Sequence, residues 1–141
     1  MRTAGKTQAL KEWASGWPDL GGYLKLNAIN NATGDASLST DFTDRARTEY
    51  IDGTADREYV FMLKMMCDWS NGFDEINAEA MRLNESWIDW VAGQYPDNVP
   101  DFGDGEITGI EPLYSAPALN MVYQEDQTAE YVFQCKIYYR E

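Results

Sequence analysis

Histidine is absent from this chain of 141 residues. Its absence removes the side chain most often used for acid–base catalysis near neutral pH and the commonest ligand of transition metals in proteins. Cysteine is scarce: Cys67 and Cys135 are the only two, and neither can be activated by an imidazole. Each lies in an apolar, strand-like run, so we expect two buried free thiols in place of a disulfide. We expect no enzymatic activity, no bound metal and no cofactor.

Basic residues are also few, with 11 lysines and arginines against 24 acidic residues, which gives a net charge of −13. Such a surplus repels both the phosphate backbone of nucleic acids and anionic lipid. No apolar run approaches the roughly 20 residues needed to span a bilayer, and no signal segment is recognisable. We therefore expect a soluble, unsecreted protein with no membrane contact and no direct DNA binding.

Large apolar side chains are plentiful, since 44% of the residues are hydrophobic and 13% are aromatic. They suffice for one core in a single domain that spans residues 1–141. Apolar residues at helical spacing predict helices over residues 3–15 and 74–93, with stop signals at Gly16 and Gly93. Asp74 is the predicted N-cap of the second helix. The predicted core stripe of that helix comprises Ile76, Ala80, Leu83, Trp87 and Val91.

Strands are predicted over residues 23–29, 57–69, 107–123 and 129–139, the third of them broken by prolines. An Asp52-Gly53 turn between strand-prone runs predicts a hairpin that leads into the second of these strands. Residues 30–44 are rich in polar and small side chains, which predicts a flexible loop or arm. The order of elements predicts an α+β fold, an antiparallel β-sheet with two helices packed on one face.

The predicted strand over residues 57–69 has two unequal faces. One carries Tyr59, Phe61, Leu63, Met65 and Cys67, and the other carries Glu58, Val60, Met62, Lys64 and Met66. Because the second face is only partly polar, we expect it to be covered in part by a helix, a loop or a neighbouring subunit.

Acidic residues are the remaining candidates for chemistry. The candidates are Asp97, Asp101, Asp104 and Glu106 for a calcium loop, and Asp68, Asp74, Glu75 and Glu79 for a general acid–base pair. The first set lacks the ligand spacing of an EF-hand, so a solvated acidic loop is the favoured interpretation. In the second set, helix capping and the polar side of a helix explain three of the four carboxylates. Trp13, Trp87 and Trp90 could line a ligand pocket, although their helical spacing favours a place in the core.

Several blocks of the chain resemble a single family. The main blocks are Tyr50-Ile51-Asp52-Gly53, Arg57-Glu58-Tyr59-Val60-Phe61 and Gln134-Cys135-Lys136-Ile137-Tyr138-Tyr139-Arg140-Glu141. Between them, Trp87-Ile88-Asp89-Trp90, Asn98-Val99-Pro100-Asp101 and residues 107–113 match in order and spacing. Together these residues resemble the small head–tail joining proteins of tailed bacteriophages, which are called minor capsid, tail completion or tail terminator proteins. The resemblance covers residues 48–141, and the segment before them matches poorly.

The resemblance implies a tail terminator, a virion structural protein that forms a homohexameric ring at the head-proximal end of the tail tube. Such a protein stops polymerisation of the tube, docks to the head connector and assembles in the bacterial cytoplasm. The implied partners are further copies of the chain, the major tail tube protein and the head connector or stopper protein. An acidic lumen would let DNA pass without specific binding. A head completion or stopper role and an acidic host-directed binding module are the alternatives.

The predicted contacts between subunits lie beside the Asp-Gly turn and on the less polar face of the following strand. They are Arg45, Arg47, Tyr50, Ile51, Val60, Met62 and Met66. A ring subunit needs sheet edges and apolar surface of this kind. For Arg45 and Arg47 the alternative is that they are solvated charges beside Asp41 and Asp44.

Overall fold

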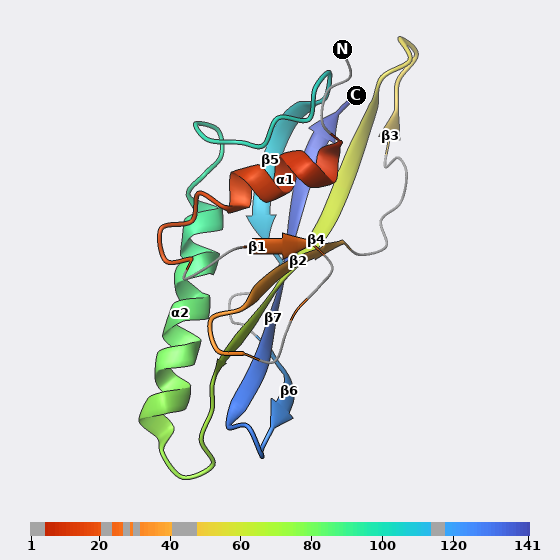
Figure 1. The fold of residues 1–141 in the computed structure, drawn as a ribbon. Coiled ribbons are helices and arrows are strands. Elements are labelled where there is room, and N and C mark those ends of the chain that lie inside the picture. Colours follow the sequence, from red (N-terminus) through yellow and green to blue (C-terminus); the bar gives the residue numbers. More distant parts are fainter. Residues whose placement is uncertain (1–4, 21–23, 27–28, 30–31, 41–47, 114–117) are drawn as a thin grey trace.

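A mixed sheet of seven strands carries two helices on one face (Figure 1). The computed structural model describes residues 5–20, 24–26, 29, 32–40, 48–113 and 118–141. In chain order the elements are α1 (Lys6–Ala14), β1 (Leu24–Leu26), β2 (Ala36–Thr40), β3 (Thr48–Glu49), β4 (Ala55–Asp68), α2 (Asp74–Ala92), β5 (Glu106–Pro112), β6 (Ala118–Tyr123) and β7 (Thr128–Arg140). The α+β class is as predicted.

Two long strands, β4 and β7, form the centre of the sheet and run the length of the molecule (Figure 1). They pair antiparallel from Asp56 opposite Arg140 to Asp68 opposite Thr128. The other edge of β4 pairs with β2 and β3, and the other edge of β7 pairs with β5 and β6. β1 pairs parallel with β2, so the prediction of a purely antiparallel sheet was wrong for this pair.

The prediction of a loop or arm over residues 30–44 was wrong for Ala36–Thr40, which form β2. Ala36 and Leu38 are each only 1% exposed and lie in the core. Backbone pairing with β4 and burial of these two side chains outweigh the low strand propensity of the surrounding polar residues. Residues 30–31 and 41–44 lie outside the described part of the chain.

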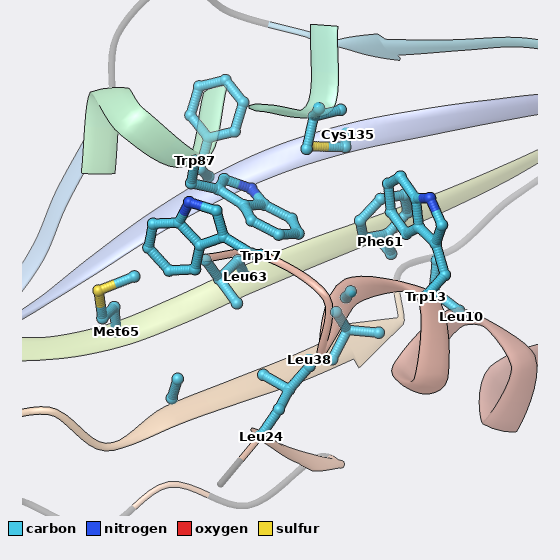
Figure 2. Close-up of a cluster of buried hydrophobic side chains, with 14 of the residues drawn as sticks. Leu10, Trp13, Trp17, Leu24, Leu38, Phe61, Leu63, Met65, Trp87 and Cys135 are labelled. Atoms are coloured by element: carbon cyan, nitrogen blue, oxygen red, sulfur yellow. The ribbon is translucent and has the colours of Figure 1, made fainter. Parts of the chain in front are cut away.

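The core lies between the helices and one face of the sheet. The predicted alternation of β4 is confirmed at Phe61, Leu63 and Met65, which are at most 2% exposed. Tryptophans join the layers: the rings of Trp13 and Trp90 are 4.9 Å apart, and the ring of Trp13 meets that of Phe61 edge-on at 6.2 Å. Figure 2 shows Trp13, Trp17 and Trp87 gathered over the strands. The tryptophans are therefore core anchors, as their spacing favoured.

The start of α2 differs from the prediction. Asp74 is the first helical residue, and Phe73 occupies the N-cap position without a side-chain hydrogen bond. The Ser70 hydroxyl instead accepts hydrogen bonds from the backbone N–H groups of Gly72 and Phe73, at 3.2 and 3.1 Å. Asp74 and Glu75 still lie in the first turn, where a negative charge is favourable to the helix dipole.

Candidate assembly interface

The hairpin between β3 and β4 has a well-defined tip. The N–H of Tyr50 donates to the carbonyl of Thr54 at 2.8 Å, and Gly53 adopts a φ of +92°. The Asp52 carboxylate accepts from the backbone N–H and the hydroxyl of Thr54, at 3.0 and 2.6 Å, and these bonds lower its pKa. An Asp-Gly pair is suited to such a turn because glycine adopts positive φ without steric cost.

Side chains of three segments hold the base of this tip. The hydroxyl of Tyr50 donates to the Asp56 carboxylate at 2.6 Å, and the Arg140 guanidinium donates to the same carboxylate at 3.0 Å. Arg140 also donates to the Tyr50 hydroxyl at 3.3 Å and lies over its ring, 4.8 Å from the centroid. Asp56 raises the pKa of Tyr50, chiefly through the hydrogen bond, and it raises that of Arg140 for the same reason. We call these three residues the hairpin clamp.

Ile51 projects from the clamped tip into solvent. Its side chain is fully exposed, at 108% of the reference value. Burying an isoleucine contributes about 1.5–3 kcal/mol relative to leaving it in water. A fully exposed isoleucine on an ordered turn is therefore available for contact with another protein surface.

The other predicted contact residues are distributed differently. Val60 and Met62 are half-buried on the outer sheet face, beside the Glu58–Lys136 ion pair of 3.2 Å. Met66 is 2% exposed, because the chain before β2 pairs with it: its backbone N–H donates to the carbonyl of Asp35 at 2.9 Å. Met66 therefore belongs to the interior of its own chain. Arg45 and Arg47 lie outside the described residues.

Four further exposed apolar side chains were missed by the sequence prediction. They are Phe73, Ile76, Leu119 and Met121, which are 64%, 38%, 51% and 50% exposed. β6 and the start of α2 lie at the end of the molecule opposite the hairpin tip (Figure 1). Ile76 was predicted to lie in the core, but the core stripe of α2 begins only at Ala80. In β6 the pairing with β7 shifts register between Leu119 and Met121. This shift interrupts the inward–outward alternation of side chains from which the exposed residues of the strand could have been predicted.

Some of the acidic residues considered as catalytic or calcium-binding candidates have structural roles, and the others do not cluster into a site. The Asp101 carboxylate accepts from the backbone N–H of Gly103 at 2.9 Å, while the neighbouring Phe102 ring packs edge-on against Tyr59 and Tyr139. Glu79 pairs with Arg82 one turn along α2. Within the described residues, no group of three or more acidic or cysteine side chains is placed to hold a metal ion.

Both cysteines are buried free thiols, as predicted. Burial raises the pKa of each, and it does so more strongly for Cys135, which has no exposed surface. Thiols in this state are poor nucleophiles at neutral pH.

Comparison with known proteins gives no relative: no protein-family model matches the chain, and no curated protein is significantly similar to it. Neither helix in the described part of the chain has the length and apolar character needed to cross a membrane.

Proposed function

We propose that this protein is the tail terminator of a tailed bacteriophage. Copies of the chain would form a hexameric ring on the head-proximal end of the tail tube, halt its polymerisation and dock to the head connector. The first support is the resemblance of residues 48–141 to head–tail joining proteins. That segment includes β4, α2 and β7, which supply most of the core.

The observation that carries the proposal is the exposed Ile51 on a hairpin tip held by the clamp of Tyr50, Asp56 and Arg140. An ordered tip presents its apolar side chain with little further loss of conformational entropy on binding. Exposed apolar side chains also lie at the opposite end of the molecule, on β6 and at the start of α2. A subunit with apolar surface at both ends suits an assembly in which each copy meets different neighbours at its two ends.

Deletion of the gene from the phage that carries it tests the role. Loss of a terminator leaves tail tubes of uncontrolled length, because nothing stops polymerisation. Electron microscopy of the lysate would measure tail length. Tails of normal length in the deletion strain would overturn the proposal, and normal tails that fail to join heads would identify a stopper instead.

Complementation then tests the part played by the hairpin. Ile51→Val keeps an apolar tip and should restore normal tails, whereas Ile51→Asp should not. Both variants should fold, because the side chain is fully exposed. Restoration by Ile51→Asp would show that the tip is not an assembly contact.

A further inference from the structure

A pocket of about 420 Å³ lies between the start of α2 and the end of β4, away from the hairpin tip. Its volume falls within the range of about 300–1,000 Å³ typical of pockets that hold ligands. Its lining residues are Thr33, Gly34, Met66, Cys67, Asp68, Glu75, Ile76, Glu79, Ala80 and Leu83.

The helix wall of this pocket is apolar. Ile76, Ala80 and Leu83 are spaced by four and three residues, so they share one face of α2. The small side chain of Ala80 leaves room that a larger residue would fill. Deeper in, the buried Asn84 amide donates to the carbonyl of Ala80 at 2.8 Å and approaches the sulfur of Cys67 at 3.8 Å. The helix wall of the pocket thus runs from Ala80, which is 5% exposed, to Ile76, which is 38% exposed.

The charged residues that line the pocket are all carboxylates. They are Asp68, Glu75 and Glu79, each of them exposed, and the ion pair with Arg82 partly offsets the charge of Glu79. The Asp68 carboxylate accepts a hydrogen bond from the Thr33 hydroxyl at 2.7 Å. Among the described residues, the lining contains no lysine or arginine. An apolar ligand with positive charge next to it would therefore match both the walls and the rim.

We propose that this pocket binds a segment of a partner protein in which leucine-like side chains are flanked by lysine or arginine. A second copy of the chain is the poorer occupant on electrostatic grounds. Each copy carries a net charge of −13, and the hairpin that bears Ile51 brings Glu49 and Asp52 with it. Like charges brought together at a contact oppose association, whereas opposite charges speed and orient it. The inference rests on the pocket alone and does not require the ring.

A synthetic peptide with two central leucines between lysines is a suitable probe. Binding to the full chain would be followed by fluorescence anisotropy at about 0.15 M salt, where only charges within roughly 8 Å interact strongly. We expect saturable binding, and affinity weaker by at least about tenfold when serines replace the leucines or glutamates replace the lysines. Equal binding of the serine-containing peptide would overturn the proposal, because it would show attraction by charge alone.

Variants of equal charge locate the site on the protein. Ile76→Lys and Leu119→Lys each alter an exposed apolar residue and add one positive charge, but only Ile76 lines the pocket. We expect Ile76→Lys to weaken peptide binding by at least about tenfold and Leu119→Lys to change it by less than about twofold. Equal losses of peptide affinity in the two variants would show that the peptide binds outside the pocket. Self-association that both Ile51→Lys and Ile76→Lys abolish would instead identify a second copy as the occupant and overturn the proposal.

Discussion

The hydroxyl of Tyr50 lies 2.6 Å from the carboxylate of Asp56, across the hairpin that ends at Ile51. This hydrogen bond raises the pKa of Tyr50, because the phenol must be neutral to donate. Its contribution to folding is complete below the ordinary tyrosine pKa of about 10 and is lost as the pH rises through the higher value of the folded state. The pH dependence that arises from Tyr50 therefore appears under alkaline conditions.

Replacement of Asp56 should bring the pKa of Tyr50 down. Asp56→Asn keeps the shape of the side chain but removes its charge, and an amide oxygen is a weaker acceptor. The ring carbon resonances of Tyr50 in an NMR pH titration would report the change. Asp52→Asn is the control, because that carboxylate bonds to Thr54 and not to Tyr50. A titration curve unchanged by Asp56→Asn would show that the hydrogen bond does not form in solution.

Gly53→Ala should loosen the hairpin tip. At a φ of +92° a Cβ atom costs about 1–2 kcal/mol, so the Tyr50 amide, bonded to Thr54, should exchange with solvent about tenfold faster. Gly72→Ala is a matched control, since a Cβ there meets nothing within 4 Å and the backbone has no positive φ. Equal exchange rates in the two variants would contradict the turn geometry.

Leu63→Ala should destabilise the whole domain. Leu63 is 1% exposed on the inner face of β4, and removing a buried leucine side chain costs about 2–5 kcal/mol of unfolding free energy. Ile51→Ala, which removes a similar side chain from full exposure, should change that free energy by less than about 0.5 kcal/mol. Urea unfolding measures both. Comparable losses would show that Ile51 is buried in solution, as it would be in an oligomer.

The two thiols should react at different rates. Cys67 lies in the wall of the pocket and is 5% exposed, whereas Cys135 has no exposed surface. Burial raises the pKa of both and so lowers the reactive thiolate fraction. With an aromatic disulfide reagent at neutral pH, we expect the Cys135→Ser variant to react faster than Cys67→Ser, and both to react more slowly than unfolded protein. The reverse order would contradict the position of the pocket.

Strong periodicity in the sequence was sufficient to predict β4, α2 and β7. Alternation from Tyr59 to Cys67 and from Tyr131 to Tyr139 identified the inner face of the sheet, since few other arrangements bury so many large side chains together. The Asp52-Gly53 pair likewise identified the hairpin. These are local signals, and local geometry is enough to interpret them.

Features that depend on contacts between residues far apart in the sequence could not be predicted from local signals. β2 has only Ala36 and Leu38 as apolar residues, and it is a strand because β4 offers it backbone partners. Ile76 fits the helical stripe of α2 but lies beyond the edge of the core. The pocket arises from the distance between that part of the helix and the end of β4, which no residue pattern encodes.

The pairing of β4 with β7 also governs when the protein can fold during its synthesis. Asp56 and its partner Arg140 are 84 positions apart, so the central ladder cannot form until the ribosome has released β7. Until then a nascent chain exposes the edge of β4 that pairs with β7, together with Phe61, Leu63 and Met65, which is an aggregation-prone surface. A chain that terminates anywhere before β7 therefore does not form a smaller folded protein and is degraded by proteases.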